Sequence, residues 1–362
     1  MFGEATAGLR ALAENLVGAD KGTIVYERWF ERTTRAMPIE EWTHKAGWVS
    51  GIDRQVSVGV YAYHPPVATL VTSAKSLMRK IAFAHRFEEH IFPRHYASEN
   101  LRSFGWLEDG DLAGELMAIR PLRPDESGAR GNDLTLGDPV QCLGFYTMLL
   151  EVQHRVGGYL PSELFDEGAF CVYEDQGGWT LRNETRRRLE QGWGTCFEFS
   201  GAEFVFAGSA EQVYTVRWDL LCSITDLLSD LGIIHRVVIS QPCFHAEPEQ
   251  SQMPTESRLY DEPTLDIELY IPQYVGSRDP WLELGGGDIA GVALTSAFGL
   301  RLGSGEPLLS GCQGFGWQRF ALAVLSQLGT DPSKWPDRLR EEYGTSLPRS
   351  RISRLFGHSV EP

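Results

Sequence analysis

The sequence lacks any apolar run that approaches the length of a membrane span, and its start lacks the charged-then-apolar pattern of a signal peptide. A membrane-spanning helix needs about 20 consecutive apolar residues, and a secretory signal needs a basic segment before its apolar core. These absences predict a cytoplasmic protein that has no membrane partner.

The cysteines lack the paired CxxC spacing that marks many zinc and redox motifs. In a large cytosolic chain, unpaired cysteines are more often buried thiols or metal ligands than parts of a disulfide framework. The sequence therefore argues against a small disulfide-stapled module and leaves a metal site open. The six cysteines are Cys142, Cys171, Cys196, Cys222, Cys243 and Cys312.

The chain is also poor in positive charge. It has 33 Lys and Arg residues against 49 Asp and Glu residues, which gives a net charge of −16. Proteins that bind long nucleic acids displace counterions with a basic surface, so we do not expect such binding here, although a local basic patch remains open. With 42% hydrophobic and 23% charged residues, the composition is that of a globular protein and not of a disordered one.

The pattern of predicted elements indicates an α+β fold. Short β-rich segments separated by turns lie between residues 170 and 206, which is typical of an antiparallel sheet. A long helix is predicted over residues 210–231, and the helices and strands around the sheet complete the α+β class. The later elements are strands over 233–239, 264–271 and 291–302 and helices over 319–328 and 332–343, with Asp331 and Pro332 as a cap and first-turn pair.

No shift in composition demands a second domain. We predict one domain over residues 66–343, with residues 1–65 as an appendage of it and residues 344–362 as a tail. A helix follows Pro65 and Pro66 and is predicted to end before Pro93. Its apolar stripe fits either a packed core or a surface that pairs two copies of the chain, and it consists of Leu70, Leu77, Ile81, Ala84 and Ile91.

A strand, two glycines and an amphipathic helix follow one another between residues 307 and 328. Glycine has no Cβ, so Gly314 and Gly316 would let a ligand approach the backbone closely. Arg319 falls on the first turn of the helix, where a guanidinium can stack on a base or hold a phosphate. By itself, the stretch is equally typical of an ordinary strand–helix junction with a buried Cys312.

Two further segments carry charged groups that a nucleotide site needs. Arg182 and Glu184 stand two residues apart at a strand end, so they share one face of the strand. They fit either a nucleotide contact or an exposed ion pair. Glu203 lies among apolar neighbours in a predicted strand, and because an unpaired buried charge is costly, it needs a metal, an amino group or an arginine as its partner.

Motifs 2 and 3 of the class II aminoacyl-tRNA synthetase catalytic domain resemble three segments of this chain in order: Arg182-x-Glu184, Glu203-Phe-Val and Gly314-Phe-Gly316-x-x-Arg319. Segments 264–272 and 281–284 resemble the seryl-type strand pair that precedes motif 3. Cys312 just before the motif 3 glycines and the segments 99–106, 139–142 and 328–336 give a closer resemblance to the amino acid:[carrier protein] ligases. These are truncated homologues of zinc-dependent seryl-tRNA synthetases. The resemblance runs weakly from about residue 70 and clearly from residue 139 to residue 336.

The resemblance implies a zinc ion held by Cys142, Glu203 and Cys312. Two thiolates and one carboxylate leave the fourth tetrahedral position open, and in that family this position takes the amino group of the substrate amino acid. Zinc would then position and select the substrate as a Lewis acid. Cys171 or Cys196 is an alternative for one of these ligands.

The resemblance also implies an ATP site. Arg182 would hold the α-phosphate, Glu184 would contact adenine, and Arg319 would stack on adenine or hold the γ-phosphate. The reaction is an in-line attack by the substrate carboxylate on the α-phosphate, which needs alignment and charge neutralisation and no protein nucleophile. The other residues predicted to line the site for ATP and Mg²⁺ are Gly314, Gly316, Glu268 and Glu283.

We therefore predict a ligase that forms an aminoacyl adenylate and transfers the acyl group to the phosphopantetheine thiol of an acyl carrier protein. tRNA is not expected as the acceptor, and basic segments within 182–188 and 338–354 are candidates for carrier docking. Class II catalytic domains pair through the motif 1 helix, so the resemblance implies a homodimer. A departure from the family, Gly285-Gly286-Gly287-Asp288 in place of a strand that carries asparagine, leaves the amino acid open.

Two alternatives keep the same fold and change the function. The acceptor is a small-molecule amine in the first, and in the second the chain is a non-catalytic paralogue that binds an amino acid or its adenylate. A nicotinamide-binding fold would rest on Gly303 and Gly305 alone, and this pair lacks the third glycine and the strand–helix context of such folds.

Overall fold

A computed structural model describes most of the regular elements of the chain. The residues that it describes are 22–30, 53–64, 67–91, 95–96, 117–119, 122–124, 134–136, 140–142, 159–160, 162–174, 180–181, 194–240, 264–272, 279–292, 295–296, 300–329 and 331–346.

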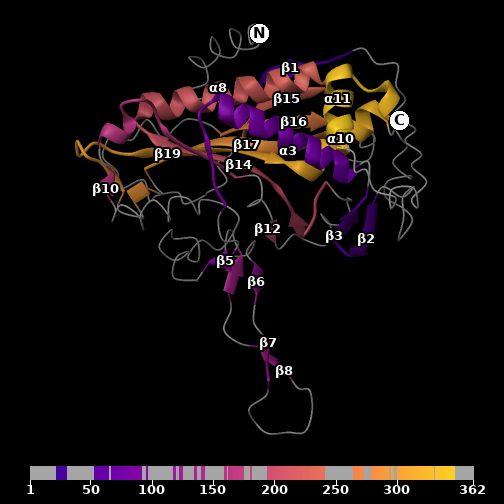
Figure 1. Cartoon of the computed structure of the whole chain (residues 1–362), viewed down its shortest axis with the longest axis horizontal. Coiled ribbons are helices and arrows are strands. Elements are labelled where there is room, and N and C mark those ends of the chain that lie inside the picture. Colours follow the sequence, from indigo (N-terminus) through magenta and orange to yellow (C-terminus); the bar gives the residue numbers. More distant parts are fainter. Residues whose placement is uncertain are drawn as a thin grey trace.

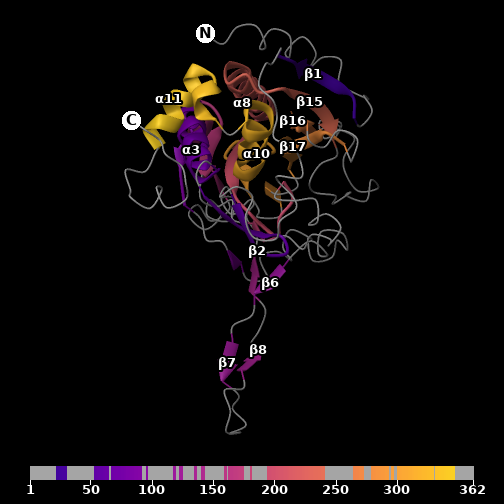
Figure 2. The same cartoon turned by 90° about the vertical axis from the view of Figure 1, so that its right-hand side faces the viewer.

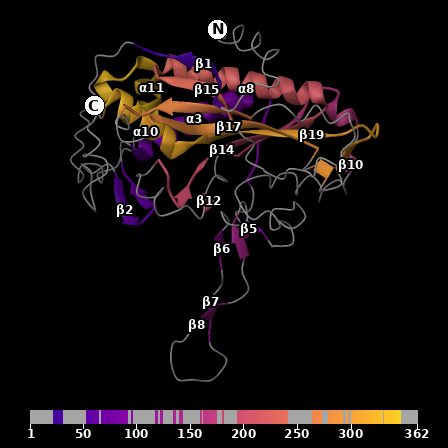
Figure 3. The same ribbon diagram turned by 180° about the vertical axis from the view of Figure 1, so that it is seen from behind.

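An eight-stranded sheet forms the centre of the molecule (Figures 1 and 3). Neighbouring strands are antiparallel except for the parallel pair at one edge, β4 and β11. β1 comes from the predicted appendage and forms the other edge by pairing with β15. In spatial order the strands are β1 (Ile24–Arg28), β15 (His235–Ser240), β16 (Thr264–Tyr270), β17 (Trp281–Gly291), β19 (Leu309–Gly316), β14 (Gly201–Gly208), β11 (Phe170–Glu174) and β4 (Glu88–Glu89).

Smaller strand groups accompany the main sheet. They are the hairpin of β2 (Asp53–Ser57) and β3 (Val60–Tyr63), the pair β12 (Thr180–Leu181) and β13 (Glu198–Phe199), the group β5 (His95–Tyr96), β9 (Val140–Cys142) and β6 (Met117–Ile119), the pair β7 (Leu122–Pro124) and β8 (Leu134–Leu136), and the pair β10 (Tyr159–Leu160) and β18 (Arg301–Leu302).

Helices α3, α8 and α10 lie on one side of the sheet, as the edge view in Figure 2 shows. The strands turn alternate residues toward them: in β16, Leu265, Ile267 and Leu269 are fully buried and belong to the same core cluster as the helices. The predicted α+β class is thereby confirmed. The helices are α3 (Val67–Ala84), α8 (Ala210–Asp230), α10 (Trp317–Leu328) and α11 (Asp337–Ser346), with short 3₁₀ turns η1 (Ser162–Phe165) and η4 (Pro332–Lys334).

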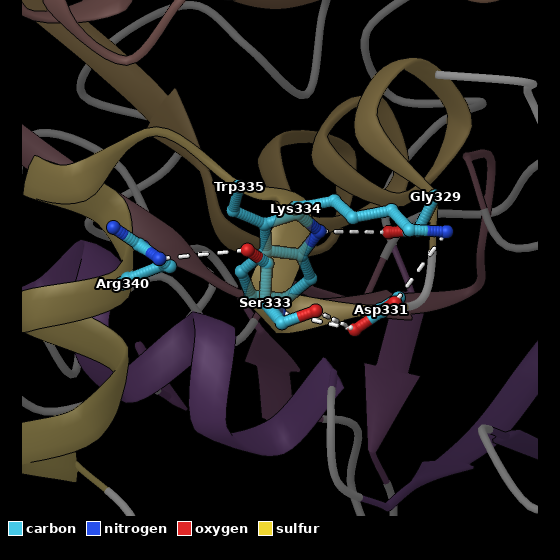
Figure 4. Close-up of polar contacts among 6 residues, drawn as sticks. All are labelled: Gly329, Asp331, Ser333, Lys334, Trp335 and Arg340. Carbon is cyan, nitrogen blue, oxygen red and sulfur yellow. Dashed lines mark hydrogen bonds and ion pairs between the residues drawn. The ribbon is translucent and has the colours of Figure 1, made fainter.

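The end of α10 shows how the chain turns back before the last helix. Gly329 has φ 79°, a conformation that glycine adopts without strain, and α10 ends there. The predicted cap pair, Asp331 and Pro332, begins η4: the Asp331 carboxylate accepts from Ser333 N (3.1 Å) (Figure 4). Trp335 Nε1 donates to Gly329 O (2.9 Å), so the chain folds back and α11 lies against α3.

The strand predicted over residues 291–302 is wrong. Gly291 ends β17 with φ 54°, and among the other described residues of this range only Arg301–Leu302 pair as a strand. A strand instead runs through the glycines at 285–287. Three glycines have low intrinsic strand propensity, but β16 and β19 pair with β17 on both sides and hold it extended.

Helix α3 is shorter than predicted. Arg86 has φ 61°, which is incompatible with helix, so α3 ends at Ala84 and Ile91 lies beyond it with 73% of its surface exposed. Leu70 and Leu77 are buried in the core. This part of the apolar stripe is therefore core and is not free to pair with a second copy, and the homodimer stays a prediction.

Candidate active site

The two faces of the sheet differ in chemistry, and two of the predicted site residues, Glu203 and Cys312, lie on the face opposite the helices. On the helix-covered face, the cross-strand row Tyr173, Phe204 and Gln313 is fully buried. The opposite side, which we call the site face, carries Glu203 on β14 and Cys312 on β19. Successive strand residues alternate between the faces, so the register alone separates these two sets.

Glu203 and Cys312 meet at the centre of the site face. Glu203 lies opposite Gly314, and Cys312 precedes that glycine by two residues, so their side chains are diagonal neighbours. They are joined by a hydrogen bond, in which the thiol is the donor. Both residues are buried, and burial raises the pKa of Glu203 to about 8. The sequence predicted a metal, an amino group or an arginine as the partner of this carboxylate, whereas the hydrogen-bond partner in the described structure is the Cys312 thiol.

Further carboxylates surround this pair. Glu174 lies opposite Glu203 on β11, and Asp288 lies opposite Cys312 on β17; both are buried. Asp288 accepts a hydrogen bond from Thr264 Oγ1. Asp266 has its pKa raised to about 7 by burial and by the nearby Glu283. The site face is thus acidic at its centre, which favours a ligand with a positive group.

The sequence did not single out Glu174, Asp266 or Asp288 as site residues. Two signals were available for the last two. Asp266 alternates with Glu268 in a strand whose intervening residues are apolar, and Asp288 ends the glycine run that was treated as a departure from the family. Alternation of this kind places both acidic side chains of β16 on one face.

The two glycines of β19 create space on the site face. Gly314 and Gly316 are partly exposed, whereas the residues between and before them are buried. A Cβ on Gly314 would stand 3.6 Å from Glu203 Oε2, which is an ordinary contact, so that position tolerates a methyl group sterically. A Cβ on Gly316 would stand 3.2 Å from Leu284 O, which is a tight contact, and 3.5 Å from Arg319 Cδ, which is an ordinary one.

Arg319 is fixed at the beginning of α10. Its Nε donates to Gly194 O (3.2 Å), and its Nη1 donates to Glu283 O (2.8 Å) and pairs with Glu283 Oε2 (3.3 Å). Its Nη2 has no partner among the described residues, and a quarter of the side chain is exposed. A guanidinium held at two nitrogens with the third available is suited to a phosphate or a carboxylate.

Glu283 and Glu268 lie opposite each other on β17 and β16. A bulge between the Ile267–Gly285 pair and the Glu268–Glu283 pair places Glu283 on the site face. Each has an arginine partner, since Arg236 Nε bonds Glu268 Oε2 at 2.7 Å and Arg319 pairs with Glu283. The Arg236 guanidinium also lies 4.3 Å from the centre of the Trp281 ring. The two carboxylates therefore stand beside the Arg319 end of the site.

A buried glutamine joins α10 to the strand next to the site. Gln318 accepts from Ser200 N (3.1 Å) and donates to Ser200 Oγ (3.1 Å), and Trp317 N donates to Ser200 O (3.0 Å). Ser200 stands between β13 and β14. These three bonds fix the first turn of α10, and with it Arg319, against the beginning of β14.

Several predicted site residues lie outside what the structure describes. Arg182 and Glu184 are beyond the described residues, and for Cys142 only the backbone strand is described. Cys171 is not a substitute ligand, because it pairs with Phe206 and so lies on the helix-covered face. Of the predicted set, the structure brings together Glu203, Cys312, Gly314, Gly316, Glu283 and Arg319, with Glu268 next to Glu283.

The predicted zinc site is only partly represented. Within the described ranges, no group of three or more His, Cys, Asp or Glu side chains is placed to hold a metal ion. A thiol and a carboxylate in direct contact are suitable zinc donors, so Cys312 and Glu203 fit such an ion as two of its ligands. None of the described helices is long and apolar enough to cross a membrane.

No family model matches the chain. Among curated proteins it is similar to the type-2 serine–tRNA ligases of Methanopyrus kandleri and Methanococcus aeolicus, with 25% identity to each over 92% of its length. The chain spans 66% and 64% of these two relatives, slightly less than two thirds of each.

Solved structures decide the fold. A crystal structure of A. aeolicus tRNASec in complex with M. kandleri SerRS matches 94% of the chain and 67% of that protein, with a TM-score of 0.74 and 21% identity. The cytoplasmic serine–tRNA ligase of Naegleria fowleri in complex with AMP matches 91% of the chain and 74% of that protein, with a TM-score of 0.67 and 12% identity. The chain has a class II aminoacyl-tRNA synthetase-like fold. Its sequence is similar to that of type-2 serine–tRNA ligases over most of its length.

The predicted transfer to a carrier-protein thiol is wrong, because the relatives are named serine–tRNA ligases and nothing supports the carrier-protein branch. The expectation that tRNA is not a partner is also overturned, since one solved relative is bound to tRNASec. That expectation rested on a net charge of −16. Charge is screened over about 10 Å in ordinary salt, so a sum over the whole chain does not describe a local binding surface.

Proposed function

We propose that this chain is a ligase that activates an amino acid with ATP, forming an aminoacyl adenylate and pyrophosphate, and passes the acyl group to a tRNA. Serine is the proposed amino acid, because the relatives are named for it. The single observation that carries the proposal is Arg319, held by Gly194 and Glu283 beside Gly314 and Gly316, with Nη2 left for a ligand.

The proposed role of each residue follows from its charge. Arg319, with Arg182, would neutralise ATP phosphates, and Glu184 would contact adenine. The acidic centre of the site face, which includes Glu203 and Asp266, would receive the amino group of the substrate. This arrangement leaves the substrate carboxylate directed toward the nucleotide, so the attack on the α-phosphate needs only alignment and charge neutralisation.

Two ions complete the proposal. Zn²⁺, held by Cys312, Glu203 and Cys142, would supply a Lewis acid that binds and selects the amino group. Mg²⁺ would enter with ATP and contact Glu283 and Glu268, since hard cations prefer carboxylate oxygens.

Pyrophosphate exchange tests the activation step. The purified chain is incubated with ATP, labelled pyrophosphate and each amino acid in turn, and exchange that depends on serine supports the proposal. Tryptophan fluorescence or calorimetry reports ATP binding in parallel. Exchange with another amino acid would change the substrate and keep the reaction, whereas absence of exchange with every amino acid and of ATP binding would overturn the proposed function.

Acceptor and metal are tested separately. Aminoacylation of total tRNA, with deacylated tRNA as the probe, supports tRNA as the acceptor, and exchange without any tRNA charging argues against it. Metal analysis of the purified chain and of Cys312→Ser tests zinc. We expect about one zinc ion per chain in the wild type and its loss in the variant, while equal metal content in both proteins would remove Cys312 from the ligand set.

A further inference from the structure

The β2–β3 hairpin contacts a segment that is distant in sequence, residues 194–200, which we call the junction segment. Phe197 N donates to Gly59 O at 2.8 Å, and Tyr63 Oη lies 3.7 Å from Cys196 Sγ. Gly59 is the turn residue of the hairpin, with φ 74°, and it is buried. Cys196 is only 4% exposed. The hairpin tip therefore packs on the junction segment and is not a free arm.

The same segment holds Arg319. Gly194 O, two residues before Cys196, accepts the hydrogen bond from Arg319 Nε. The other end of the segment is fixed by the three bonds between Ser200 and the first turn of α10. Between these two ends, Cys196 and Phe197 contact the hairpin, which belongs to the predicted appendage.

A backbone carbonyl is positioned only as well as the chain that carries it. Gly194 has no side chain to anchor it, so the position of its carbonyl depends on the residues that follow. Two consecutive residues of the segment, Cys196 and Phe197, are bonded to the hairpin. Loss of those contacts would let the Gly194 carbonyl shift, and a displacement of about 1 Å at a substrate-positioning group can cost about a hundredfold in rate.

We propose that the β2–β3 hairpin positions Arg319 for ATP through the junction segment. Among the described residues, no hydrogen bond or ion pair joins the hairpin to Arg319 directly. Tyr63 and Cys196 act as positioning residues, and the Gly194 carbonyl transmits their effect to the guanidinium. This inference rests on the proposed function, because it assumes that Arg319 binds ATP.

The test uses substitutions that keep the fold. Tyr63→Phe keeps the ring that packs against the core and removes only the hydroxyl, and Cys196→Ala removes the thiol from the other side of the same contact. The double variant completes a mutant cycle, which isolates the coupling between the two groups. Val58→Ser is the matched control, because Val58 lies at the tip of the same hairpin and 48% of its surface is exposed.

Three quantities are measured on the full chain: the Kd for ATP by calorimetry, the KM values for ATP and amino acid in pyrophosphate exchange, and the Tm. We expect ATP binding to weaken about threefold to tenfold in each single variant, as a net hydrogen bond contributes. The double variant should be no weaker than the worse single variant, since both break one contact. In the Tyr63 and Cys196 variants, the KM for the amino acid should stay within about twofold of the wild-type value. In Val58→Ser, the Kd for ATP and both KM values should stay within about twofold of the wild-type values.

Each other outcome overturns the inference in a recognisable way. If the wild type binds ATP and the Tyr63 and Cys196 variants bind it equally well, the hairpin has no positioning role and the proposed function stands. If ATP and amino acid bind less well by the same factor while the Tm falls, the contact is merely structural. If the wild type itself binds no ATP and shows no exchange, the proposed function fails and the inference fails with it.

Discussion

On the helix-covered face of the sheet, β16 presents Leu265, Ile267 and Leu269, whereas on the site face the same strand presents Asp266, Glu268 and Tyr270. The first set packs into one apolar core. The second set is only partly buried, and its acidic members have raised pKa values. One strand can serve both purposes because its side chains alternate, so stability and chemistry are encoded in interleaved positions and can be perturbed separately.

Glycine distribution separates the faces further. Gly311 points toward the helix-covered face, where a Cβ would come within 2.6 Å of the Phe206 ring, so this glycine is required for close packing. Gly314 points toward the site face, where a Cβ would make only an ordinary contact with Glu203. A glycine that packing does not require leaves room for a ligand.

The largest effect should come from the helix-covered face. Phe204→Ala removes a fully buried ring that packs against Tyr173 and Phe87, at centroid distances of 4.9 Å and 5.3 Å. We expect a loss of about 3–5 kcal/mol in the free energy of unfolding, measured by urea denaturation. A loss below about 1 kcal/mol would mean that this row is not part of the core.

The next effect should come from the site face, as a loss of activity. Arg319→Ala removes a charged group that is partly exposed and that we propose holds an ATP phosphate. We expect kcat/KM for ATP in pyrophosphate exchange to fall about a hundredfold, as the loss of charge-assisted hydrogen bonds predicts. Arg338→Ala, which removes an arginine paired with Asp230 far from the site, is the control and should leave exchange unchanged. If both variants lowered exchange equally, the loss could not be assigned to the position of Arg319 in the site.

The two faces should also respond to pH with opposite signs. Burial lowers the pKa of His235, on the helix-covered face, from 6.5 to about 4. Between these values the unfolded chain binds a proton that the folded chain does not, so stability should rise with pH, by on the order of 3 kcal/mol across that window. Burial, with the nearby Glu283, raises the pKa of Asp266 from 3.8 to about 7, so there the folded chain binds the extra proton and stability should fall as pH rises.

Substitutions should separate the two slopes. His235→Asn keeps a donor for Ile233 O, which His235 Nδ1 contacts at 2.7 Å, and should remove the rise in stability. Asp266→Asn should remove the fall. Urea denaturation at several values between about pH 4 and pH 8 measures both slopes. If the two variants change the slope in the same direction, the assignment of one titrating group to each face is wrong.

Two glutamines of α10 offer a smaller, paired comparison. Gln318 bonds Ser200 next to the site, and Gln327 bonds Ile234 N (2.7 Å) and Tyr270 O (2.7 Å) away from it. Either residue changed to Met leaves buried backbone groups unsatisfied, which we expect to cost about 1–3 kcal/mol of stability. Only Gln318→Met should also raise the KM for ATP, by several fold. A matching rise in Gln327→Met would show that the effect is global.

The smallest effect is expected at Gly314, the glycine that packing does not require. Gly314→Ala should fold normally, because the added methyl group stands 3.6 Å from Glu203 Oε2. It should weaken amino acid binding by several fold, since the methyl group occupies ligand space. Titration of the amino acid against the wild type and the variant measures the change. Unchanged affinity would place the ligand elsewhere on the site face.

The sequence allowed prediction of the elements whose pattern agrees with their surroundings. The strand ending at Gly316, the helix that carries Arg319 and the strand around Glu203 were all recognisable, because apolar periodicity and glycines fall where the fold uses them. The meeting of Glu203 with Cys312 follows from register between strands that are far apart in sequence. Only the resemblance to a family predicted that meeting, since neither strand contains a local signal for it.

The remaining features depend on tertiary context. The resemblance predicted a strand over residues 281–284, the first part of β17, but not its continuation through residues 285–287. Three glycines there lack strand propensity, and pairing with β16 and β19 overrides that preference. The early end of α3 depends on the positive φ of Arg86, which no local sequence pattern predicts. The acceptor was predicted wrongly because composition is a whole-chain sum, whereas binding depends on where charges lie.

The position of β19 in the sheet has a consequence for biosynthesis. This strand inserts between β17 and β14, and it is the last strand of the main sheet in chain order. When β14 and β17 have emerged from the ribosome and β19 has not, the edges of these two central strands are unpaired. Unpaired strand edges can pair with other chains. Closure depends on long-range contacts, which form slowly, so a chaperone that shields these edges until the last strand emerges should raise the yield of folded protein.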